Sequence, residues 1–115
     1  SGRIMEAITL YHQSLGLNQE FVDAYNNLGQ AYEASGDIDA AIANYQMATE
    51  HDPDFGGAWF NLGVLYETQF RYGQALIAMQ RAEELLVSNP EHQSFANRAA
   101  QAVDRLLEKL ADRAL

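Results

Sequence analysis

The sequence repeats itself with a period of 34 residues, and this feature restricts the possible folds most strongly. When the chain is shifted by this length, identical or chemically similar residues coincide. The coinciding pairs are Tyr25 with Trp59, Asn27 with Asn61, Leu28-Gly29 with Leu62-Gly63, Tyr32 with Tyr66, Ala41 with Ala75, and Ala48 with Ala82. A period of this length indicates a repeat protein in which each unit is one supersecondary structure that must pack against a neighbour.

Each period has the pattern of two amphipathic helices joined by a short turn. Over residues 23–34 and 38–48, apolar residues recur every three or four positions, which is typical of a helix with one buried face. Gly36 suits the left-handed position that ends the first helix, and Asp37 can cap the second. Because glycine and alanine recur inside the helices, we expect close backbone approach, with Trp59 packed between the helices of its own repeat.

The segment Trp59-x-x-Leu62-Gly63-x-x-Tyr66 resembles the signature of the tetratricopeptide repeat (TPR) family. The preceding repeat differs only in having a tyrosine at the first aromatic position. Further positions of the motif are occupied by Ala41, Tyr45, Ala48, Pro53, Ala75 and Ala82. The resemblance extends over about residues 1–88 and implies an all-α fold, a right-handed superhelix of antiparallel helix pairs.

We expect a single TPR domain over the whole chain. Its predicted parts are a partial repeat with only a second helix (1–21), two full repeats (22–55 and 56–89) and a C-terminal capping helix (90–115). Pro90 comes three residues later than the period predicts, so the second helix of the repeat over 56–89 should be extended. Asn89 and Pro90 form a helix-start signal, and the apolar residues from Phe95 to Leu110 share one face of the helix that follows.

The residue types argue against chemistry. The chain has no Cys, and His12, His51 and His92 stand apart from any pattern that binds metal or activates a nucleophile. We therefore expect no catalysis, no cofactor and no metal. No run of about 18 apolar residues occurs, which argues against membrane insertion.

The charge is strongly acidic and unevenly distributed. The net charge is −9, and residues 4–70 contain ten acids with no Lys or Arg. A field of this sign repels nucleic acid and favours a basic or neutral protein partner. The same charge also serves to keep a protein in solution, so it does not by itself prove a partner.

The TPR resemblance implies that the first helix of each repeat lines a concave groove for an extended peptide. The candidate contacts are Asn26, Asn27, Gln30 and Glu33 in the first full repeat, and Phe60, Asn61 and Glu67 in the second. An amide both donates and accepts hydrogen bonds, so Asn27 and Asn61 could hold a peptide backbone, or each could bond to a neighbouring turn instead. Glu33 and Glu67 would make the groove acidic, and Phe60 would offer an apolar anchor.

The sequence therefore predicts a protein-interaction scaffold that binds an extended peptide or protein segment, basic or neutral, in an acidic groove lined with asparagine. Two alternatives stay open. The first is a homodimer formed through the last helix or the N-terminal half-repeat, where Ile4, Ile8 and Tyr11 lack a covering helix. The second is a regulatory or substrate-recruiting appendage of an enzyme that lies outside this chain.

Overall fold

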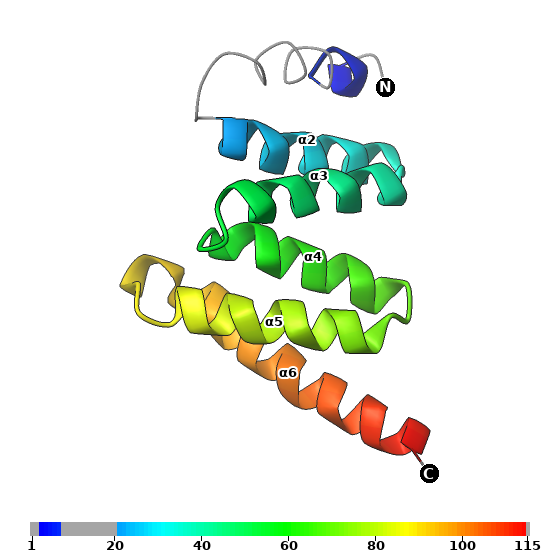
Figure 1. Ribbon diagram of the computed structural model, residues 1–115, viewed down its shortest axis with the longest axis vertical. Helices are drawn as coiled ribbons and strands as arrows, with labels where there is room; N and C mark the ends of the chain where they lie inside the picture. Colours follow the sequence, from blue (N-terminus) through cyan, green and yellow to red (C-terminus); the bar gives the residue numbers. More distant parts are fainter. Residues whose placement is uncertain (1–2, 8–20, 115) are drawn as a thin grey trace. The chain divides into compact units, whose positions relative to one another are not determined.

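The computed structural model describes residues 3–7 and 21–114. The chain divides into two compact units, Ser1–Pro53 and Asp54–Leu115, here called unit 1 and unit 2. Unit 1 contains a helical stretch over residues 3–7 and an antiparallel hairpin of α2 (Phe21–Ser35) and α3 (Ile38–His51) (Figure 1). Ile8, Tyr11 and His12, which belong to the predicted partial repeat, lie outside the described residues.

The turn between α2 and α3 closes through backbone hydrogen bonds that need a left-handed residue. Gly36 has φ 87°, its N–H bonds to Glu33 O at 3.1 Å, and the Asp37 N–H bonds to Tyr32 O at 3.0 Å. These two bonds form a Schellman motif, which satisfies carbonyls that the end of α2 would leave unpaired. Asp37 Oδ1 then accepts from Ala40 N at 3.2 Å and caps α3, as the sequence predicts.

The core of unit 1 is built around one aromatic ring. Tyr45 on α3 is completely buried, and a Cβ added at Gly29 would overlap its ring. Gly29 is therefore the residue that lets the Tyr45 ring lie against the backbone of α2. Leu28, Ala41 and Ala48 are also fully buried beside it, so small residues on one helix accommodate large ones on the other.

Unit 2 begins with a second hairpin, formed by α4 (Gly56–Thr68) and α5 (Tyr72–Leu86). Here Met79 faces Gly63, where an added Cβ would lie 2.7 Å from Met79 Cγ. Met79 therefore occupies the place that Tyr45 holds in unit 1. Trp59 is only half-buried, so the fully enclosed large side chains are not the signature tryptophan that the repeat pattern emphasises.

The second hairpin is followed by a short turn, a 3-10 helix η1 (Pro90–His92) and the long helix α6 (Gln93–Ala114). Asn89 caps this segment by accepting the Glu91 N–H at 2.9 Å. α5 ends at Leu86, one residue beyond the position equivalent to the end of α3, and the other added residues form the turn. α6 packs along α5 and buries Ala96, Ala99, Ala102 and Leu106 (Figure 1).

Candidate peptide-binding surfaces

In unit 1, the predicted contact residues lie along α2. Gln30 and Glu33 are exposed, and Asn26 and Asn27 are half-buried. Glu33 is fixed from below, because Tyr45 Oη donates a hydrogen bond to Glu33 Oε1 at 2.8 Å. Burial raises the pKa of Tyr45 far above its ordinary value, and the hydrogen bond to Glu33 adds to this effect. The phenol therefore stays protonated and donates to Glu33 at any physiological pH.

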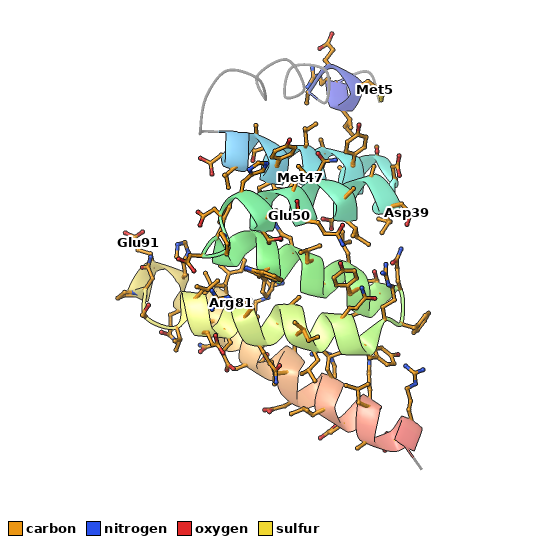
Figure 2. The ribbon with its side chains drawn as sticks, viewed as in Figure 1. Met5, Asp39, Met47, Glu50, Arg81 and Glu91 are labelled. Carbon is orange, nitrogen blue, oxygen red and sulfur yellow. The ribbon has the colours of Figure 1, made fainter. Side chains whose placement is uncertain are left out.

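Unit 1 also carries an uninterrupted negative charge. Its acids between residues 22 and 53 are Asp23, Glu33, Asp37, Asp39, Glu50 and Asp52, and this range contains no Lys or Arg. All of these acidic residues are exposed, and Figure 2 shows Asp39 and Glu50 at opposite ends of α3. A surface of this sign attracts a cationic segment, and the attraction weakens with salt.

In unit 2, α6 covers part of the surface that the sequence assigns to a ligand. Phe60 is only 6% exposed, because its ring meets Phe95 of α6 edge-on at 5.4 Å. The Arg98 guanidinium lies over both rings, 5.0 Å from the Phe60 centroid and 5.5 Å from that of Phe95. Phe60 therefore helps to dock α6, while Asn61 on the same helix remains half-exposed.

Glu67 is engaged by α6 as well. Its carboxylate accepts from Arg105 Nε at 2.7 Å and Nη2 at 2.8 Å, and Lys109 Nζ lies 3.3 Å away. The Arg105 hydrogen bonds hold the pKa of Glu67 below its ordinary value; burial opposes this shift and Lys109 reinforces it. The negative charge expected at this position is thus balanced by two cations, unlike that of Glu33 in unit 1.

A hollow opens between α4 and α6. It measures about 270 Å³ and is lined by Phe60, Val64, Glu67, Thr68, Met79, Arg98, Gln101, Ala102 and Arg105. Its apolar side chains come from Phe60, Val64, Met79 and Ala102, while Arg98 and Arg105 contribute guanidinium groups. The sequence analysis did not assign Arg98, Arg105 or Lys109 to this surface, although the one-turn spacing of Arg105 and Lys109 places both on one face of their helix.

The Glu67 cluster makes a pH-dependent contribution to stability. Because its folded-state pKa is depressed, the Glu67 carboxylate stabilises the fold above its unfolded pKa of about 4.3, and this contribution is lost as the pH falls through the lower folded-state pKa. We expect Glu67→Gln to cost about 1 kcal/mol at neutral pH, since Arg105 and Lys109 are partly exposed. Melting temperatures across this acidic range should fall less steeply for the variant.

A matched control for this prediction is Glu84→Gln. Glu84 pairs with Arg81 at 3.3 Å but is 68% exposed, so its removal should change little. Parallel pH profiles for wild type and Glu67→Gln would show that the cluster does not couple protonation to stability.

No metal-binding cluster of three or more His, Asp or Glu occurs within residues 3–7 and 21–114. In the same ranges, no helix combines the length and apolar character needed to cross a membrane.

Helix hairpins that recur every 34 residues, with glycine and alanine at the helix contacts, define an all-α helical-repeat protein. Three family models match the chain: one described as tetratricopeptide repeat over residues 22–55, one as TPR repeat over 1–36, and one as tetratricopeptide repeat over 56–85. The chain belongs to the tetratricopeptide repeat family. A search of curated protein sequences finds no significant match.

Several solved structures share this fold. The type III secretion translocator chaperone SycD of Yersinia enterocolitica matches with a TM-score of 0.85 and 19% identity, over 96% of this chain and 76% of SycD. SycD in complex with a peptide of the translocator YopD matches with a TM-score of 0.85 and 19% identity, over 94% of this chain and 82% of that one. The TPR2B domain of yeast Sti1, in complex with Hsp70, has a TM-score of 0.79 and 20% identity, over 94% of this chain and 86% of that domain. At such identities the likeness concerns the fold.

Proposed function

We propose that this chain is a non-enzymatic scaffold that binds an extended segment of another protein. The observation that carries the proposal is the exposed, wholly acidic α2 surface, on which Asn27, Gln30 and Glu33 are accessible on the first helix of a TPR repeat. The similar SycD and Sti1 structures were solved with a peptide of YopD and with Hsp70, which supports a protein or peptide partner here.

The α2 surface would select a basic or neutral segment. Glu33 is fixed by Tyr45, so its carboxylate is held in place before a ligand arrives. Asn27 would hold the peptide backbone through its amide, and Asn61 would do the same from the equivalent position of α4. Lysine or arginine side chains in the ligand would then meet exposed carboxylates in unit 1.

In unit 2, the ligand would contribute an apolar side chain. The hollow between α4 and α6 has an apolar lining large enough for one such group, and its carboxylate is already neutralised by Arg105 and Lys109. Phe60 would line the base of this hollow, because α6 covers most of its ring.

The test is a double variant, Asn27→Ala with Asn61→Ala. A short extended peptide of alternating Lys and Leu serves as probe, with fluorescence anisotropy as the measurement. Losing amide hydrogen bonds at two positions should weaken binding at least about tenfold. We expect the same peptide with Glu in place of Lys to bind poorly, and added salt to weaken binding of the Lys peptide.

The matched control is Asn44→Ala with Asn97→Ala, which removes two amides from α3 and α6 instead. Circular dichroism establishes that both double variants are folded. Equal affinity of the two double variants would show that Asn27 and Asn61 do not hold the peptide. Light scattering on the free protein tests the alternative of self-association through α6, whose Leu107 is 47% exposed.

A further inference from the structure

The turn between α4 and α5 contains a phenylalanine in a conformation that favours glycine. Phe70 has φ 61° and is the one non-glycine residue with positive φ in the described part of the chain. Its backbone makes the same pair of bonds as the turn of unit 1: Phe70 N to Glu67 O at 3.0 Å and Arg71 N to Tyr66 O at 2.9 Å. The equivalent position 34 residues earlier is Gly36. A side chain at this position raises the free energy of the fold.

Burial of the ring does not compensate for this strain. The Phe70 residue is 72% exposed, the most exposed of the large hydrophobic residues in the described ranges. Its ring contacts Tyr72 edge-on at 6.2 Å between centroids. A strained backbone that presents a large aromatic group to solvent is not explained by folding, and such outliers are frequent at binding sites.

Cations surround this pair of rings. Lys109 Nζ lies 5.0 Å and Arg113 Cζ 5.7 Å from the centroid of Tyr72, and both come from the last turns of α6. On the other side, Arg71 Cζ lies 4.8 Å from the Tyr66 centroid. We call the surface formed by Phe70, Arg71, Tyr72, Lys109 and Arg113 the turn patch.

The turn patch is positively charged although the chain is acidic. Arg71 donates to the neutral amides of Gln69 and Gln74, and within the described residues neither Arg71 nor Arg113 has a carboxylate at ion-pair distance. Lys109 shares the single carboxylate of Glu67 with Arg105. The acids beside Lys109 and Arg113, Glu108 and Asp112, are exposed and lie about 100° around the helix.

From these contacts we infer that the turn patch is a second docking surface, and that its partner is an acidic segment of another protein that carries an aromatic residue. The partner's ring would cover Phe70, and its carboxylates would bind Arg71 and Arg113. Arginine binds carboxylates in a bidentate manner, and Phe, Tyr and Arg are the residue types enriched at the energetic centres of interfaces. This surface is separate from the α2 face of unit 1, which has the opposite charge.

The decisive variant is Phe70→Gly, which removes the proposed anchor and relieves the backbone. The probe is a short peptide with one central Phe between runs of Asp and Glu, and its controls replace the Phe with Ser or every acid with Lys. We expect the acidic Phe peptide to bind wild type, and the variant to bind it at least about tenfold more weakly with an unchanged or higher melting temperature. Ile77→Ala is the control, since Ile77 is 64% exposed on α5 and should leave affinity unchanged.

A second pair of variants tests the charges. Arg113→Gln should weaken the acidic peptide and reduce the salt dependence of its binding, whereas Arg81→Gln, which removes an arginine paired with Asp54 and Glu84, should not. Equal affinity of wild type and Phe70→Gly, or no preference for acidic over Lys-substituted peptide, overturns the proposal. So does concentration-dependent self-association that Phe70→Gly abolishes while no peptide binds, because the partner is then a second copy of this chain.

Discussion

Replacing Tyr45 with Ala is expected to lower the free energy of unfolding by about 3–5 kcal/mol. Tyr45 is the largest of the fully buried side chains, and it fills the space against α2 that Gly29 leaves open. Removing its ring would leave a cavity that the hairpin cannot close without moving one helix toward the other. Since a domain of this size is stable by only about 5–15 kcal/mol, much of unit 1 should unfold. Urea denaturation followed by circular dichroism measures the loss.

The control for this prediction is Tyr45→Phe, which keeps the ring and removes only the hydroxyl bound to Glu33. We expect a loss of about 1 kcal/mol, because Glu33 is exposed and can exchange its partner for water. Equal losses for the two variants would mean that the hydroxyl, and not the packing of the ring, dominates. Burial raises the folded-state pKa of Tyr45, so its contribution is complete below an unfolded pKa of about 10 and declines as the pH rises further.

The second large effect is expected for Leu106→Ala, at about 2–5 kcal/mol. Leu106 is fully buried in unit 2 and comes from α6, whose contacts with the rest of the unit are mainly with α5. Loss of this side chain should release α6 from α5 and expose the rings of Phe60 and Met79 to solvent. Hydrogen exchange measured by mass spectrometry should therefore increase first over residues 93–114.

Leu107 provides the matched control, because it is the next residue and is 47% exposed. Leu107→Ala should change the free energy of unfolding by no more than about 0.5 kcal/mol. If Leu107→Ala destabilised the chain as much as Leu106→Ala, the rotational position of α6 on α5 would be different from the one described. If only self-association were lost, Leu107 would belong to an interface between copies.

The helices and their ends could be predicted because their signals are local and recur at fixed spacing. Gly36 and Asp37 mark one turn by residue type alone, and Asn89 with Pro90 marks the start of the C-terminal segment. The closeness of the helices could also be predicted from Gly29 and Gly63. The identity of the ring at that contact could not, since the motif emphasises Trp59 whereas Tyr45 is the one that is fully enclosed.

The candidate site was harder to predict, because its charges come from distant parts of the chain. Glu67 meets Arg105 and Lys109 at separations of 38 and 42 residues, and neither distance is the repeat period. Glu33 and Glu67 are equivalent in the sequence pattern, yet one receives a tyrosine hydroxyl and the other two cations. Only the placement of α6 distinguishes them, and a periodicity argument contains no information about a helix outside the repeat.

The turn at Phe70 also has a consequence for the order of folding. In the hairpin of unit 1, the local preference of Gly36 and the packing of α2 and α3 favour the same backbone, so its turn is populated early. In the hairpin of unit 2, Phe70 disfavours locally the backbone that the packing of α4 and α5 requires. Closure of that hairpin must therefore wait for its hydrophobic contacts to form. We expect the α2–α3 hairpin to lead and the α4–α5 hairpin to follow, a sequence of events set by a single residue.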